Sequence, residues 1–209
     1  DGKSLLPIGV TRVTGDFVQT SNGLLGVTIH SLVGAADRLE IDGSAVIGGV
    51  IVPTVISLLP GTVPVVTATS MTSSAQAQDS LLFDWNAEQR GNTLTLTPHS
   101  DFTPAGVALN RSQLSLANYF ARAWDNADVA FATQFADMSG IDTATGYTTM
   151  LNQLSGQDIQ AQSLALANSA GSILGASMSC PVFVGNGVLL GEDNCSWATI
   201  SGRWTDQGT

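Results

Sequence analysis

One stretch of the sequence decides which fold is expected: DRLEIDGSAVIGGVIV, at residues 37–52. Apolar and polar residues alternate along its first half, and glycines divide it into short runs. Similar runs recur at residues 23–29, 63–66 and 94–96. Such alternation is typical of strands that bury one face. The pattern fits the successive turns of a solenoid, whose small residues permit tight corners, and it fits the short, regularly spaced strands of a β-sandwich equally well.

The composition narrows the classes of partner. The 209 residues suit one domain, or one elongated domain with a tail. Seven Lys and Arg stand against 17 Asp and Glu, for a net charge of −10. This balance argues against nucleic acid, which requires clustered basic residues, and against a basic membrane-surface binder. Disorder is disfavoured because 44% of the residues are hydrophobic and only 11% are charged.

The N-terminus and the apolar runs do not show whether the protein is exported. The chain begins Asp1-Gly2-Lys3, without a basic region or an apolar core typical of a signal peptide, which is expected of a processed fragment. No run of 18 consecutive apolar residues occurs, so the sequence predicts no transmembrane helix.

The pattern changes to a helical one after about residue 102. Thr103-Pro104 is a typical helix start, because Thr caps free amides and Pro loses nothing at the first helical position. Further helices are expected at residues 129–138 and 143–154, and a last one after a capping-box spacing at residues 155–158. The apolar residues at helical spacing are Leu109, Leu116, Phe120 and Trp124, then Ile159, Leu166 and Ile173.

Two cysteines, Cys180 and Cys195, bracket a short segment rich in Gly, Asn and Val. A disulfide between them would stabilise the fold by about 3 kcal/mol in the chain-entropy model and would imply an oxidising compartment. The alternative is two buried free thiols. A zinc site is poorly supported, because the segment lacks a CxxC spacing and nearby histidines.

The last segment, residues 196–205, alternates between a mostly apolar and a mostly polar face, with aromatic residues near its ends. This is the pattern of a strand in a membrane β-barrel, and the residues expected to mark that strand are Trp197, Ile200 and Trp204. A single strand cannot span a bilayer, because its backbone groups would be unpaired. Either the strand is soluble, or the rest of a barrel lies outside this sequence.

Taken in order, these segments resemble the junction region of an autotransporter, the type V secretion system of Gram-negative outer membranes. Residues 37–52 resemble the last rungs of a passenger β-helix, and residues 64–68 and 92–96 are similar to the strands of an autochaperone region. Residues 109–113 (LNRSQ) resemble the start of the helical region, and residues 151–156 (LNQLSG) one of its later elements. Residues 195–204 resemble the opening strand of the translocator barrel.

The resemblance implies a mainly β fold with a helical segment. It implies right-handed β-helix rungs and an autochaperone-like cap at residues 1–101, a helical linker at 103–176, a disulfide-closed loop at 177–195, and a first barrel strand at 196–209. The residues expected in the β-helix core are Leu25, Val27, Ile29, Leu39, Ile41, Val50, Val52, Leu94 and Leu96.

The function implied is support for outer-membrane translocation and for folding or display of a passenger at the cell surface. The expected partners are the outer membrane, the barrel assembly machinery and a host or cell-surface ligand, but not nucleic acid. A surface adhesin or structural solenoid is the alternative, and an extracellular polysaccharide-acting β-helix enzyme is a weaker one.

The sequence offers no catalytic, cofactor-binding or metal-binding constellation. His30 and His99 each have an adjacent serine, but neighbours on a strand point to opposite faces, so neither pair is expected to be a dyad. Acid pairs near residues 125–128 and 137–142 are more typical of a helix surface than of a glycosidase. We therefore expect no enzymatic activity in this part of the protein, no cofactor and no metal.

Overall fold

The computed structural model describes residues 8–155, 181–184 and 188–192. The chain divides into two compact units, residues 1–151 and residues 152–209.

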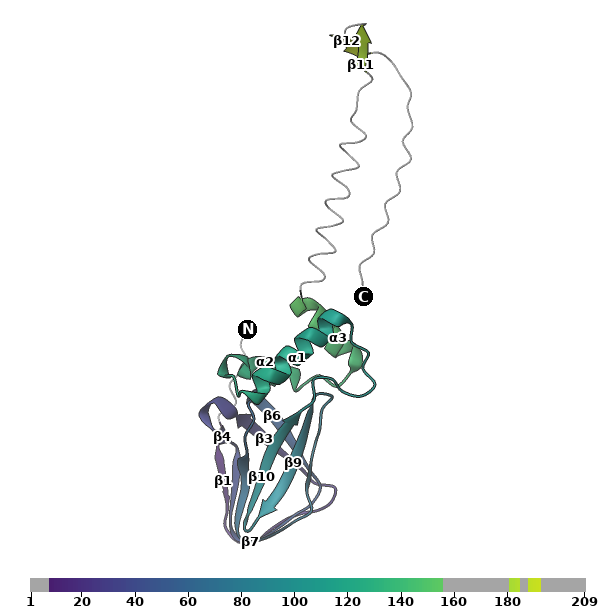
Figure 1. The fold of residues 1–209 in the computed structure, drawn as a ribbon. Helices are drawn as coiled ribbons and strands as arrows, with labels where there is room; N and C mark the ends of the chain where they lie inside the picture. The colour runs from purple at the N-terminus through teal and green to yellow at the C-terminus, as the bar shows by residue number, and fades with distance from the viewer. Residues whose placement is uncertain (1–7, 156–180, 185–187, 193–209) are drawn as a thin grey trace. The chain divides into compact units, whose positions relative to one another are not determined.

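Two sheets form most of the first unit (Figure 1). The six-stranded sheet has the order β1-β5-β7-β10-β9, and β2 also pairs with β5. The four-stranded sheet has the order β4-β3-β6-β8. The bounds in the first sheet are β1 Val10–Val13, β2 Phe17–Gln19, β5 Arg38–Ile47, β7 Val63–Ser73, β9 Phe83–Arg90 and β10 Thr93–Ser100. Those in the second are β3 Leu24–His30, β4 Ala35–Ala36, β6 Val50–Ser57 and β8 Gln76–Ala77, and a short 3-10 helix, η1, spans Ser31–Val33.

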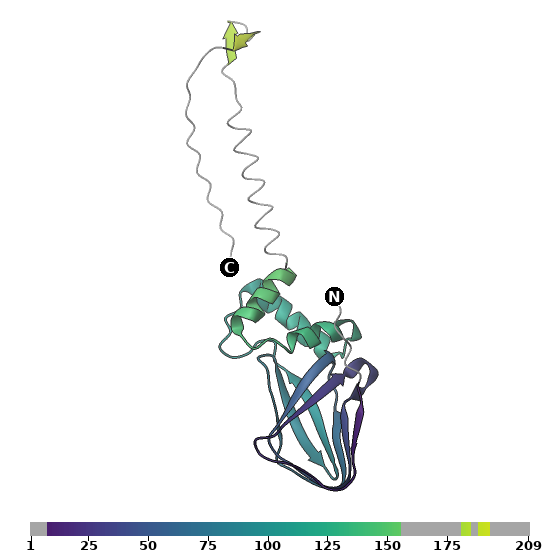
Figure 2. The same cartoon turned by 180° about the vertical axis from the view of Figure 1, so that it is seen from behind.

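Helices cover one end of the two sheets, as the views from both sides show (Figures 1 and 2). They are α1 Arg111–Asp125, the 3-10 helix η2 Val129–Phe131, α2 Ala132–Met138 and α3 Ala144–Ser155. A backbone bond from Leu58 N to Ala132 O, 2.8 Å long, ties the end of β6 to α2.

The expected fold class, right-handed β-helix rungs followed by a helical linker and a barrel strand, is wrong for this structure. The described residues form a mixed fold of sheets and helices, with two sheets in the first unit, one of them curled into a half-barrel, and three α-helices. Two physical features separate this fold from the expectation. The first sheet ends in antiparallel pairing of β7, β10 and β9, and helices supply part of the core.

The sequence pattern did contain a real repeat, which appears as parallel strand pairing. Val13 faces Ile41, Leu24 faces Val50, and Leu39 faces Val66, so each strand pairs with one that follows 26 to 28 positions later. Each of these pairings places apolar side chains of like position beside one another. Short alternating runs therefore predicted strands within β3, β5, β6, β7 and β10, but not how the sheets end.

Glycines allow the corners between the sheets to approach closely. Gly48 N donates to Gln19 O, and Val50 N donates to Gly23 O, at 2.9 and 3.0 Å. Gly49 between them has a φ of +74°, and a Cβ there would lie 2.2 Å from Gly23 O. Only glycine fits this position, because both the backbone conformation and the space exclude a side chain.

Alternation places one set of apolar residues between the sheets and the helices. Of the expected core residues, Val27, Ile29, Ile41, Leu94 and Leu96 are buried, and Leu25 and Leu39 are half-buried against the core. Val50 and Val52 are only half-buried, and it is Ile51 between them that is fully buried. The run Val50-Ile51-Val52 is apolar on both faces, so its alternation could not show which face points inward.

The first long helix begins later than its sequence suggested. Thr103-Pro104 does not start a helix; α1 starts at Arg111, with Asn110 as its N-cap. The Asn110 side chain accepts from Gln113 N at 2.9 Å, and the Gln113 side chain accepts from Asn110 N at 2.8 Å. This reciprocal capping box satisfies two free backbone amides at once. It explains the Asn and Gln of the LNRSQ segment by their role in starting α1.

Aromatic side chains join the helices to the sheets. Phe83 of β9 packs against Phe102 and Trp124, with ring centroids 5.8 and 5.3 Å apart. Phe135 of α2 contacts Trp124 edge to face, and Phe120 of α1 contacts both Phe102 and Phe135. Such pairs contribute roughly 0.5–1.5 kcal/mol each beyond the area they bury. The helices are thus part of the same core as the strands.

In the second unit the structure describes the end of α3 and one antiparallel hairpin, β11 Pro181–Val184 with β12 Val188–Glu192. The hairpin falls within the segment expected to be a disulfide-closed loop. The remaining predictions for this unit fall outside the described residues: the cysteines Cys180 and Cys195, the helix residues Ile159, Leu166 and Ile173, and the barrel residues Trp197, Ile200 and Trp204.

The corner glycine gives a first test. Gly49→Ala should lower the free energy of unfolding by roughly 2 kcal/mol or more, because the new Cβ meets backbone oxygens at a positive φ. Gly26→Ala is the matched control, since nothing lies within 4 Å of a Cβ at that position. Urea titration of both variants measures the difference, and equal stabilities would contradict the close corner.

The capping box gives a second test. Asn110→Ala should destabilise the first unit by about 1 kcal/mol, because the Gln113 amide at the helix start loses its acceptor. The exposed residue Ser112 serves as control, and Ser112→Ala should change the free energy of unfolding by less than about 0.5 kcal/mol. Thermal unfolding followed by circular dichroism compares the two, and a neutral Asn110→Ala would show that the cap does not hold α1.

Candidate functional site

The candidate site is the open end of the two sheets, formed by the free edges of β1, β2 and β3. Within the described residues, β1 and β2 pair only with β5. In the same part of the chain, β3 pairs with β6 along one edge, and its other edge meets β4 only at Ile29 and His30. Free strand edges present backbone donors and acceptors to a further strand. The opposite side of the six-stranded sheet ends instead in the β9–β10 hairpin.

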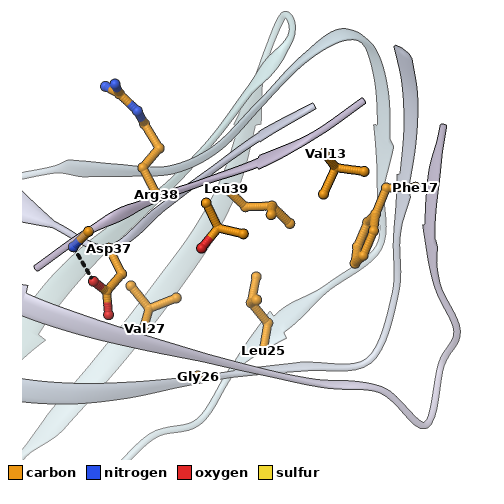
Figure 3. Close-up of a pocket in the computed structure, with 10 residues that line it drawn as sticks. Val13, Phe17, Leu25, Gly26, Val27, Asp37, Arg38 and Leu39 are labelled. Atoms are coloured by element: carbon orange, nitrogen blue, oxygen red, sulfur yellow. Dashed lines mark hydrogen bonds between the residues drawn. The ribbon is translucent and has the colours of Figure 1, made fainter. Parts of the chain in front are cut away.

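A mainly apolar pocket of about 490 Å³ lies between these free edges. Val13, Phe17, Leu25 and Leu39 point toward one another across it, from both sheets (Figure 3). Val27 lies deeper and is buried. The volume falls within the range of ligand-binding pockets, but the lining lacks the several convergent polar groups that orient a small molecule. An apolar groove between two free edges suits an extended polypeptide segment better.

Asp37 closes one end of this pocket and ties its walls together. Its carboxylate, labelled in Figure 3, accepts hydrogen bonds from Gly9 N at 2.8 Å and from Thr28 N at 2.9 Å, so it links the residue before β1 to β3. Burial opposes the charged form, but the hydrogen bonds from Gly9 and from the side chain and backbone of Thr28 outweigh it and hold the pKa of Asp37 below its ordinary value. The charged carboxylate therefore stabilises the open end.

Two arginines near the open end share one carboxylate. Glu40 accepts from Arg12 Nε at 3.0 Å and pairs with Arg38 through its other oxygen. Arg38 also lines the pocket, but its guanidinium points away from the apolar side chains (Figure 3). Both guanidinium groups are thus paired with Glu40 within the six-stranded sheet, and the pocket stays mainly apolar.

Parallel register brings His30 close to Ser57, a pair that the sequence analysis missed. Ser57 Oγ lies 2.7 Å from His30 Nδ1, and it accepts a hydrogen bond from Leu32 N at 3.0 Å. His30 and Ser57 are register partners, so the spacing of 26 to 28 positions was the signal that could have found them. Ser57 is 1% exposed, so its hydroxyl is closed to a substrate and the pair is a structural link between η1 and β6.

A second, polar pocket of about 170 Å³ lies among β6, the segment before β9 and the α2–α3 connection. Asp79 and Asp142 line it, and Asp79 accepts from Trp85 N at 2.6 Å. Of the acids considered from sequence, Asp128 is used as the cap of η2. In the part of the chain that the structure describes, no three His, Cys, Asp or Glu residues come together in a group suited to a metal ion.

The four expected helix residues that the structure describes lie in the core or at its border, and Leu109 precedes α1 instead of lying in it. Phe120 and Trp124 are buried in the aromatic cluster, and Leu109 and Leu116 pack against it partly buried. The open end instead depends on residues that the sequence analysis did not single out, chiefly Val13, Phe17 and Asp37. No local pattern marks them, because their role comes from lying at edges that no other described strand covers.

No family model, no curated protein and no solved structure matches the chain. Among the helices that the structure describes, none is both long and apolar enough to cross a membrane.

The Asp37 link predicts a pH-dependent loss of stability. The pKa of Asp37 is lower in the folded chain than in the unfolded one, so its contribution is present above the unfolded pKa of about 4 and is lost as the pH falls through the folded value. Asp37→Asn should cost about 1 kcal/mol at pH 7, and the difference from the unchanged chain should shrink below pH 4.

Urea unfolding at pH 7 and pH 3 measures this effect. Asp42→Asn, an exposed change that removes the same charge, is the control and should leave stability nearly unchanged at both pH values. A deficit for Asp37→Asn of the same size at pH 3 as at pH 7 would show that the charge does not matter.

Proposed function

We propose that the chain is the junction between passenger and translocator in an autotransporter, and that it supports the folding and display of a strand-rich passenger at the cell surface. The observation that carries the proposal is the one-sided form of the first unit. Its six-stranded sheet is finished by the β9–β10 hairpin, while within the described residues β1, β2 and most of β3 have a free edge beside an apolar pocket. A passenger strand can pair there in the direction that the sheets already use.

The energetics of the unit suit this role. Its core joins strands and helices through one aromatic cluster, so the unit can fold as a single body before another segment joins its open end. Strands added to a folded edge avoid the entropic cost of forming a first pair. Folding outside the membrane would then prevent the chain from sliding back, without ATP.

Composition supports the same proposal. Only 11% of the residues are charged, which lowers the cost of moving an unfolded chain through a narrow pore, because each charge must be desolvated or screened. The motifs at residues 109–113 and 151–156 add the resemblance of the helical region.

The test introduces a charge into the core of the first unit, in the full reading frame expressed in a Gram-negative host. Ile41, on β5, is 4% exposed, so Ile41→Asp should destabilise the unit by on the order of 4 kcal/mol or more. We expect the passenger to stay on the periplasmic side, inaccessible to protease added to intact cells.

Val46 provides the matched control on the same strand. It is 48% exposed, so Val46→Asp adds the same charge without entering the core and should leave surface display unchanged. Normal display of the Ile41→Asp protein, with the unit shown to be unfolded, would contradict the proposed role.

A further inference from the structure

The outer face of α1 differs in charge from the rest of the protein. The seven Lys and Arg residues of the chain include Arg111 and Arg122, which lie at the two ends of this helix. They are 11 positions apart, so they project from the same face to within about 20°, roughly 16 Å apart along the axis. Both are exposed.

These two arginines lack the ion pairs that the other described arginines make. Arg12 and Arg38 pair with Glu40, and Arg90 pairs with Glu88. Within the described residues neither Arg111 nor Arg122 makes an ion pair. In a chain with a net charge of −10, two unpaired guanidinium groups on one face are a local excess of positive charge.

Uncharged side chains lie between the arginines, and two of them are large and apolar or aromatic. Leu114 is 43% exposed and Tyr119 46% exposed, and the exposed residue Asn118 lies on the same side of the helix. Asp125 also lies on this face, three positions after Arg122, so within α1 the net charge of the face is +1. Tyrosine is enriched at membrane–water interfaces, and basic residues near a membrane surface are attracted to anionic lipid.

The opposite face of α1 is fixed in the core. Gln113, Ala117, Phe120 and Trp124 are buried, so the helix cannot turn over, and its outer face is held in place as a rigid surface. Such a surface can contact headgroups without entering the hydrocarbon.

We propose that this face of α1, defined by Arg111, Leu114, Asn118, Tyr119 and Arg122, docks on the phosphate-bearing headgroups of an anionic lipid surface. Guanidinium groups bind phosphate oxygens in a two-pronged geometry, an amide side chain offers two further donors, and tyrosine places an amphipathic ring at headgroup level. The overall charge argued against such binding. However, the Debye length is about 8 Å at physiological salt, so acidic groups farther away are largely screened. The charges nearest to the lipid surface therefore determine the electrostatic part of binding.

This proposal does not depend on the junction proposal, because it concerns only the surface of the chain and requires no passenger. The experiment is sedimentation of the 209-residue chain with vesicles at about 0.15 M salt. One set contains phosphatidylcholine with roughly one-third phosphatidylglycerol, and the other contains phosphatidylcholine alone. We expect binding to the anionic vesicles to exceed binding to the neutral ones.

Matched double variants separate a local face from overall charge. Arg111→Gln with Arg122→Gln should reduce partitioning to anionic vesicles on the order of 30-fold, which is about fivefold for each arginine near the surface. Arg12→Gln with Arg90→Gln changes the net charge equally and should retain the binding. Thermal unfolding of both proteins shows that each remains folded.

Three outcomes would overturn the proposal. These are no preference of the unchanged chain for anionic vesicles, an equal loss in the two double variants, or undiminished binding of the Arg111 and Arg122 variant. Tyr119 also packs against Phe131, so loss of binding on Tyr119→Ser supports contact at the headgroup level when thermal unfolding of that variant is unchanged.

Discussion

The parallel ladder around β5 is the interaction on which the rest of the structure depends. β5 lies between β1 and β2 on one edge and β7 on the other, so it fixes the register of the six-stranded sheet. That register places Ile41 and Ile47 on the inner face, and it brings the Gly48-Gly49 corner against the corner that precedes β3. A shift of one position would turn every inward side chain outward. These corners connect the two sheets, so they also set the register between β3 and β6 in the second sheet.

Helices cover one end of the two sheets and complete the hydrophobic core there. The end of β6 is tied to α2, and aromatic side chains from α1 and α2 fill the space over the sheets. The capping box at Asn110 sets where α1 begins, and thereby which of its faces is buried. The same choice leaves Arg111 and Arg122 on the outside. A local capping motif therefore determines the character of a surface that extends over about three helical turns.

The charge of the protein is sparse but not uniform. On the strands, each described arginine pairs with a glutamate two positions away or on the neighbouring strand. Asp37 is used to hold the open end, where its charge binds two backbone amides. The open end itself is apolar, which suits pairing with another strand, and the outer face of α1 is basic. The two surfaces are chemically different and suit different kinds of partner.

The sequence by itself indicated the strands β3, β5, β6, β7 and β10, the helical segment and several inward residues, because alternation and helical spacing are local consequences of burying one face. It also contained the capping box, as the spacing of Asn110 and Gln113. Only the tertiary structure decided that the sheet ends in an antiparallel hairpin, that Ile51 rather than Val50 or Val52 points inward, and that His30 meets Ser57. The face of Ile51 and the His30–Ser57 contact depend on strands 26 or 27 positions away, which a single run of residues does not show, and the local β9–β10 hairpin ends the sheet because β10 also pairs with β7.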